Sequence, residues 1–277
     1  MFDAKVLDVI KRTRDVLSLR FQRPDDFEYL PGQYMFIELN IGGVKKRKHF
    51  SLSSSPTEHG YVEITKRLTG HEFSNALNSL KVGDVVSLEA PFGLFTLNKK
   101  HHRIIFLTGG IGITPIRSMI RYASDIGSEI DMILLYSCKD EDNIPFREEL
   151  EKTQSQNPRF KVFHTLTRPD KGWLGLMGRI NARMIQSVAP DYLDRVAYVS
   201  GPKSMVEDIL SILKVELGFN SEQLKYEFFP GFDKEEFKPG NSDKLIKNRN
   251  NLAFIWSSKA KNAFRFLTKS WFTVIHS

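Results

Sequence analysis

The hydrophobic pattern of this chain changes near residue 100, and that change constrains the fold more than any other feature. Before it, short segments rich in β-branched and aromatic residues alternate with turn clusters such as Pro31-Gly32 and Gly42-Gly43. Such spacing is typical of a small antiparallel β-barrel or sandwich. One helix is expected at 72–80, where apolar residues share a face. The expected strands are residues 6–10, 16–21, 34–39, 61–65 and 85–90.

After residue 98, short apolar strands alternate with amphipathic helices. This alternation indicates a parallel sheet that is covered on both faces. We therefore predict two domains, an N-terminal antiparallel β-barrel over 1–98 and a C-terminal α/β domain with a parallel sheet over 103–232. The expected strands are 103–108, 131–138, 160–166 and 195–201, and the expected helices are 116–124, 145–154 and 203–217.

Residues 233–277 fit neither pattern and form a basic, aromatic tail. Nine Lys/Arg and four Asp/Glu give this tail +5 of the net charge of +7. The remaining +2 gives little support for a nucleic-acid partner. Phe264, Leu267, Trp271 and Val274 would share one helical face beside several bases. The tail is therefore either disordered or a helix that contacts an anionic membrane surface or a partner groove.

Cysteine content and apolar run length exclude several classes of protein. Cys138 is the single cysteine, so this chain alone cannot build a disulfide, an iron–sulfur cluster or a cysteine-ligated zinc site. The longest apolar runs are far shorter than the roughly 20 residues that span a bilayer. The first residues show no signal-peptide pattern. We expect a cytoplasmic protein without a metal site.

The segment Gly109–Pro115 is the most informative motif. It follows an apolar strand and opens a helix. Glycines allow a tight turn and close approach of a ligand, and a helix N-terminus offers free N–H groups to a phosphate. It differs from the G-x-G-x-x-G dinucleotide fingerprint, and a strand–helix turn without a ligand is the alternative.

Three further segments could carry chemistry. In Lys45–Pro56, bases precede an aromatic residue and several hydroxyls, which suits a phosphate and a ring but also a solvated basic turn. Ser200–Met205 joins a strand to a helix, and an ordinary helix start is the alternative. In Glu227–Phe232, the aromatic residues could equally belong to the core.

Taken in order, these segments resemble the ferredoxin–NADP reductase superfamily of flavoprotein reductases. The resemblance extends over about residues 5–232 and rests on the ordered set, because each motif alone is weak. Its landmarks are Pro31–Tyr34, Lys48–Ser51, Gly70–Ser74, Gly83-Asp84, Pro91–Gly93, Gly109–Pro115, Gly201-Pro202 and Glu227–Phe232.

The resemblance implies a barrel that binds a flavin, FAD in preference to FMN, without a covalent bond. Ser51 would bond near the reactive flavin nitrogen. Lys48 stands where the family usually has arginine, so it keeps the charge but loses the bidentate fork. The residues assigned to the flavin are Lys48, His49, Phe50, Ser51, Thr65, Lys66, Ser74 and the closing Phe232.

The resemblance also implies an α/β domain that binds NADPH or NADH. Ser200 replaces a frequent cysteine, and Phe232 replaces a closing tyrosine and is followed by 45 further residues. Ser51, Ser200 and Glu227 would be the catalytic residues. Those assigned to the nicotinamide cofactor are Gly110, Gly112, Ile113, Thr114, Pro115, Arg168, Gly201 and Pro202.

The function implied is an oxidoreductase that passes hydride from NAD(P)H to flavin and then electrons to a separate acceptor, such as a ferredoxin or an oxygenase component. The alternative is a non-catalytic binding or regulatory protein on a reductase fold, motivated by Lys48 and Ser200. The sequence leaves the acceptor, the oligomeric state and the choice between NADH and NADPH open.

Overall fold

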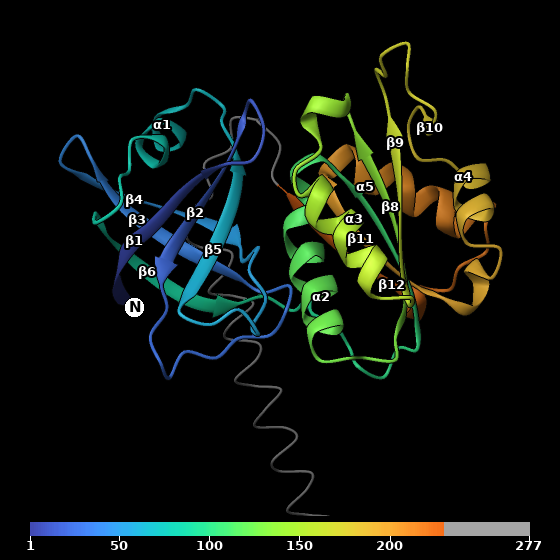
Figure 1. Ribbon diagram of the computed structural model, residues 1–277, viewed down its shortest axis with the longest axis horizontal. Coiled ribbons are helices and arrows are strands. Elements are labelled where there is room, and N and C mark those ends of the chain that lie inside the picture. Colours follow the sequence, from blue (N-terminus) through green and yellow to red (C-terminus); the bar gives the residue numbers. More distant parts are fainter. Residues whose placement is uncertain (230–277) are drawn as a thin grey trace, which may run out of the picture. The chain divides into compact units, whose positions relative to one another are not determined.

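Six antiparallel strands and one helix form the first domain in the computed structural model, which describes residues 1–229 (Figure 1). The strands follow the order β4-β3-β6-β1-β2-β5. A bridge between Leu52 and Ile64 joins the end of β4 to β5, so the sheet is barrel-like. The elements are β1 (Phe2–Lys11), β2 (Val16–Gln22), β3 (Tyr34–Ile41), β4 (Val44–Ser51), β5 (Tyr61–Arg67), α1 (Glu72–Asn78) and β6 (Val85–Phe92).

Alternation along the strands fills this barrel. In β3, Met35, Ile37 and Leu39 are buried, whereas Tyr34 and Phe36 face the other side. A period of two is what a half-buried strand requires. The antiparallel barrel predicted from the sequence is confirmed.

Strand β4 was not predicted, because its basic residues suggested a turn. Charged side chains are depleted in strands, but long ones can cover neighbours and pair across them. Lys45 pairs with Glu38 at 2.9 Å, and the Arg47 guanidinium lies 3.8 Å from the centre of the Phe36 ring. These neighbours on β3 account for a basic strand at this position.

A parallel sheet with helices on both faces forms the second domain, as predicted. Its order is β10-β9-β8-β7-β11-β12, and every pair is parallel. Helices α2 and α3 pack on one face and α4 and α5 on the other. The elements are β7 (Arg103–Gly109), α2 (Ile113–Asp125), β8 (Asp131–Cys138), α3 (Arg147–Gln156), β9 (Phe160–Leu166), β10 (Leu176–Met177), α4 (Ala182–Val188), β11 (Val196–Pro202), α5 (Lys203–Ser211) and β12 (Leu224–Phe229).

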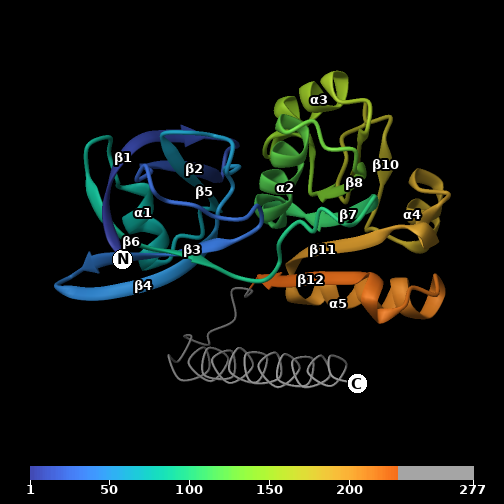
Figure 2. The same ribbon diagram turned by 90° about the horizontal axis from the view of Figure 1, so that it is seen from below.

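The strand order reverses at β7, which lies between β8 and β11. Ligands of open α/β sheets bind outside the carboxyl ends of the strands at such a switch point. This order brings the end of β7 and the end of β11 side by side. Figure 2 shows β11 beside β12 at the sheet edge, with α5 against both.

Several boundaries differ from the sequence-based expectation. Helix α2 begins at Ile113, three residues earlier than expected, and α4 and β10 were missed because both are short. Helix α5 ends at Ser211 and continues as a π-helical segment over Ile212–Glu216. The last barrel strand ends at Phe92 and β7 begins at Arg103, and we keep the division between 98 and 103 as a proposal.

The tail over 233–277 lies outside the described residues. Within residues 1–229, no helix is long and apolar enough to cross a membrane.

Candidate functional site

A buried lysine lies at the barrel end where the flavin residues were expected. Lys66 on β5 donates to the Ser74 hydroxyl of α1 at 2.5 Å, and the Thr69 amide donates to the same hydroxyl at 3.0 Å. Burial and the nearby charge of Lys48 lower the pKa of Lys66 to about 8. Within residues 1–229, no carboxylate pairs with Lys66. Two ammonium groups that influence one another in this way are suited to an anion such as a phosphate.

The residues of β4 divide between two faces. The Phe50 ring stacks on Phe73 at 6.1 Å, and the Lys48 ammonium lies 5.7 Å from the same ring. His49 instead contacts Tyr34 and Phe36 on the opposite face, and burial lowers its pKa. Lys48 and Phe50 therefore share a face with α1. The cofactor role of His49 stays a prediction.

Ser51 and Thr65 are both buried, but Thr65 has its hydroxyl engaged. The Thr65 hydroxyl lies 2.7 Å from the Ser18 hydroxyl and 2.8 Å from the Ser53 hydroxyl. A contact from Thr65 to a flavin would therefore use its methyl group or backbone. Ser51 stands at the end of β4, where the chain leaves the barrel sheet.

The glycine turn after β7 forms a cradle at the switch point. The Ser200 hydroxyl donates to the Gly112 carbonyl at 2.7 Å, and a Cβ on Gly112 would lie 2.5 Å from the Ser200 carbonyl oxygen. Only glycine fits there. Gly110 adopts a φ of +53°, a region that favours glycine. Gly201 and Pro202 complete the end of β11 beside this turn.

Helix α2 begins directly after the glycine turn. Thr114 donates its hydroxyl to the Ile111 carbonyl at 3.1 Å, and Pro115 lies in the first helical turn. Proline is well suited to a first turn, because the N–H it lacks has no partner there. Amides at the Ile113 cap already donate to the Gly110 and Ile111 carbonyls, so a phosphate here would be favoured mainly by the positive end of the helix dipole.

Arg67 connects the flavin end of the barrel to the glycine turn, and sequence reasoning missed it. It ends β5 and pairs with Asp15. A Cβ on Gly110 would lie 3.7 Å from the Arg67 Nη2. The signal was present, since Arg67 directly follows Lys66 at a strand end. An arginine here suits a nucleotide phosphate.

Glu227 on β12 is the most perturbed acid of the site. Burial raises its pKa to about 7. Its Oε2 is buried and has no hydrogen-bond partner among the described residues. Burial raises the pKa of Tyr34 in the barrel, and the charge of Glu227 raises it further, so the two residues are neighbours. A carboxyl group with a pKa near 7 can take up or release a proton at neutral pH.

Two predicted residues have no place among these contacts: one is exposed elsewhere, and the other is not among the described residues. Arg168 is exposed just after β9, with its amide donating to the Lys139 carbonyl at 2.7 Å. Phe232 lies outside the described residues. Among residues 1–229, no cluster of His, Cys, Asp and Glu is placed to hold a metal ion.

Two family models match this chain. Residues 3–97 match the model of the oxidoreductase FAD-binding domain, and residues 106–210 match that of the oxidoreductase NAD-binding domain. The chain belongs to the ferredoxin–NADP reductase superfamily. The barrel is the FAD-binding domain, and the α/β unit is the NAD-binding domain.

One relative and two solved structures illustrate the likeness. The glycine betaine monooxygenase reductase subunit of Pseudomonas aeruginosa is 33% identical over 217 residues, which cover 76% of this chain and 59% of that protein. The chain thus spans about three fifths of that relative.

The structural matches are the flavohem-like FAD/NAD-binding domain of a Vibrio cholerae nitric oxide dioxygenase and a Neisseria gonorrhoeae ferredoxin NADP⁺ reductase with bound FAD and NADP. The first has a TM-score of 0.74 at 22% identity, covering 83% of this chain and 98% of that one. The second has a TM-score of 0.70 at 18% identity, with the same coverage. At these identities the structures show the fold.

The residues of this chain fit both cofactors. Lys66 offers a buried ammonium to a flavin phosphate, and Lys48 and Phe50 share its neighbourhood. Gly112 lets the turn pack directly against the end of β11, where a Cβ would clash with the Ser200 carbonyl oxygen, and the positive end of the α2 dipole suits a phosphate of the nicotinamide cofactor. Glu227 brings a carboxyl oxygen that has no partner in the described part of the chain.

Proposed function

We propose that this chain is a flavoprotein reductase that takes hydride from NADH or NADPH and passes electrons to a separate acceptor protein. One observation supports this reading most. The glycine turn of the NAD-binding domain lies against Arg67, one residue after the Lys66 that bonds to Ser74 in the FAD-binding barrel. Sites for two cofactors would then meet at one place, as hydride transfer requires.

A bound flavin would accept hydride and release electrons one at a time. Lys66, with Lys48 nearby, would hold its phosphate, and Phe50 would pack against it. Ser51 would offer a hydroxyl donor where charge develops. Glu227 would hold or release a proton at Oε2 near neutral pH, where its pKa of about 7 leaves both forms populated.

The nicotinamide cofactor would lie on the glycine turn. The Gly112 carbonyl is fixed by the Ser200 hydroxyl, so this turn is rigid before the cofactor arrives. Arg67 would pair with the nucleotide phosphates, and Arg168 would select between NADH and NADPH. These roles extend the predicted site by one residue, Arg67.

The acceptor we propose is an oxygenase component or a ferredoxin. The Pseudomonas aeruginosa relative is named as the reductase subunit of a monooxygenase, and the Neisseria gonorrhoeae structure is a ferredoxin reductase. A cytoplasmic location and a membrane or partner contact through the tail stay predictions. Cell fractionation of the full chain would check both.

The test is a reductase assay on the purified chain. Heat release and chromatography identify the flavin, and FAD is expected. Ferricyanide reduction is then followed with NADH and with NADPH. Turnover that depends on the flavin would support the proposal. Tight cofactor binding without turnover would favour the non-catalytic alternative, and failure to bind either flavin would overturn both the flavin site and the function.

A further inference from the structure

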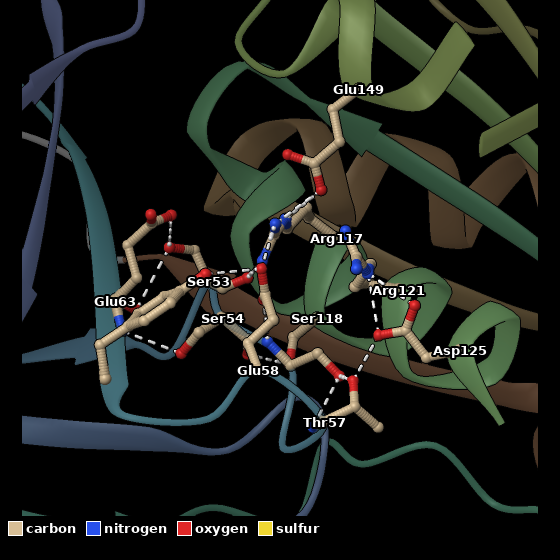
Figure 3. Close-up of polar contacts among 12 residues, drawn as sticks. Ser53, Ser54, Thr57, Glu58, Glu63, Arg117, Ser118, Arg121, Asp125 and Glu149 are labelled. Atoms are coloured by element: carbon tan, nitrogen blue, oxygen red, sulfur yellow. Dashed lines mark hydrogen bonds and ion pairs between the residues drawn. The ribbon is translucent and has the colours of Figure 1, made fainter. Parts of the chain in front are cut away.

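A buried arginine connects the two domains, and none of the roles above uses it (Figure 3). The Arg117 side chain on α2 is 3% exposed. Its Nη1 donates to the Ser53 carbonyl at 2.8 Å and to Glu58 at 2.5 Å, and its Nη2 donates to Glu58 at 3.0 Å. Glu149 of α3 accepts from Nε at 2.7 Å and pairs with Nη2 at 2.6 Å. The five N–H bonds of the guanidinium thus have five acceptor contacts.

The carboxylate on the barrel side is held just as firmly. Glu58 also accepts from the Ser55 amide at 2.7 Å and the Tyr61 hydroxyl at 2.8 Å. Burial opposes its ionisation, but the Arg117 hydrogen bonds and charge outweigh burial and bring the Glu58 pKa to about 2. Glu149 and Glu58 likewise raise the pKa of Arg117 against burial. The pair therefore stays ionised at every pH at which the protein would work.

Two further contacts join α2 to the barrel segment 53–58. The Ser118 hydroxyl donates to the Ser54 carbonyl at 2.6 Å, and the Thr57 hydroxyl donates to Asp125 at 2.5 Å. The Ser54 hydroxyl in turn accepts from the Glu63 amide of β5 at 2.8 Å. This segment is thus fixed to the barrel on one side and to α2 on the other (Figure 3).

The covalent path from this cluster to the two cofactor sites is short. Ser53 comes two residues after Ser51, and Arg117 comes five residues after Gly112. A buried ion pair is weak evidence for stability, since apolar replacements are often neutral or better. The ion pair instead fixes geometry, because the planar fork of arginine binds a carboxylate in one orientation.

We propose that Arg117 is a positioning residue for hydride transfer, which holds the glycine turn of the NAD-binding domain in register with Ser51 of the barrel. The proposal rests on the proposed function. A displacement of about 1 Å between reacting groups can cost about 100-fold in rate. Arg117 would act through the turn and Ser51, without touching either cofactor.

The experiment compares Arg117→Met, Arg117→Lys and Glu58→Gln with a matched control, Arg195→Met. Arg195 is equally buried, at 5% exposed, and pairs with Asp131 and Asp191 inside the α/β domain. It directly precedes β11, at the opposite end of the parallel strands from the glycine turn. Losing it removes a buried arginine without releasing the barrel.

Stopped-flow reduction by NADH or NADPH, whichever reduces the wild type, separates the limiting rate from the cofactor dissociation constant. The limiting rate should fall about 100-fold in Arg117→Met, if misplacement is of the order of 1 Å, and by less in Arg117→Lys and Glu58→Gln. The dissociation constant should change by less than about threefold, since the turn itself is intact. Arg195→Met should keep the wild-type limiting rate.

Calorimetry of the purified chain gives a readout that does not depend on activity. The wild type and Arg195→Met should unfold in one transition, whereas Arg117→Met should show two. A wild-type limiting rate in the Arg117 and Glu58 variants, or an equal slowing in Arg195→Met, would overturn the proposal. If Arg117→Met does not fold, the two conservative variants decide. If the wild type itself is not reduced, the proposed function fails, and calorimetry alone decides whether Arg117 couples the domains.

Discussion

Replacing Glu227 with glutamine should change how stability depends on pH. The pKa of this carboxyl group rises from 4.5 to about 7 on folding, because burial penalises the charged form. The folded state then holds a proton that the unfolded state has lost, so this group lowers stability as pH rises from about 4.5 to 7. Over the whole difference between the two pKa values, the loss in free energy of unfolding is about 3 kcal/mol, at 1.36 kcal/mol per pKa unit.

Glutamine keeps the shape of the side chain and cannot ionise. Between pH 5 and pH 8, the free energy of unfolding of Glu227→Gln should therefore rise by about 2.5 kcal/mol relative to that of the wild type. This is the part of the pH-dependent destabilisation that falls within that interval. Urea unfolding at the two pH values measures this gain.

The exposed Glu222, changed to glutamine, is the control for the general effect of removing a carboxylate. Its stability relative to the wild type should not show the same rise with pH. A Glu227→Gln variant whose relative stability is the same at pH 5 and pH 8 would refute the buried, protonated carboxyl group. It would also remove the argument for Glu227 as a proton-holding group.

Three further outcomes follow from the site. Ser51→Ala should keep its flavin but be reduced about 100-fold more slowly, as for loss of one preorganised donor, and unchanged stopped-flow reduction would contradict its role. Lys66→Met should weaken flavin binding, and the affinity of the wild type for flavin should fall as pH rises above about 8, where Lys66 loses its charge. Fluorescence titration across that range measures both effects. A flavin affinity that does not change with pH would argue against a phosphate contact. Arg168→Ala should weaken NADPH much more than NADH if it meets a 2′-phosphate, and equal effects in steady-state kinetics would assign it elsewhere.

Local patterns predicted the two domains and the turn at the switch point. Met35, Ile37 and Leu39 alternate along one strand, and Gly109–Pro115 joins a strand to a helix, so both features are visible within a few residues. Strand β4 was not predicted, because a run of exposed basic residues is more typical of a solvated turn. Its partners on β3 become apparent only once the sheet is paired.

The rest of the site depends on contacts between distant residues. No motif in the sequence singles out Arg117, and its partner Glu58 is 59 residues away in the other domain. Likewise, the sequence allows Glu227 to be either a surface charge or a site residue. Its raised pKa is caused by burial, which the sequence does not show. No periodicity or short motif encodes either property, since each depends on residues that are distant in the sequence and meet only in the folded chain.

The central claim is that hydride moves from a nicotinamide on the glycine turn to a flavin in the barrel. Anaerobic stopped-flow mixing of the flavin-loaded chain with NADH or NADPH, and with the same cofactor deuterated at the transferred position, tests it directly. The account predicts bleaching of the visible flavin band by one equivalent of cofactor, with slower bleaching by the deuterated form. A flavin band that stays unchanged with both cofactors, or bleaching that is insensitive to deuterium and to Ser51→Ala, would contradict it.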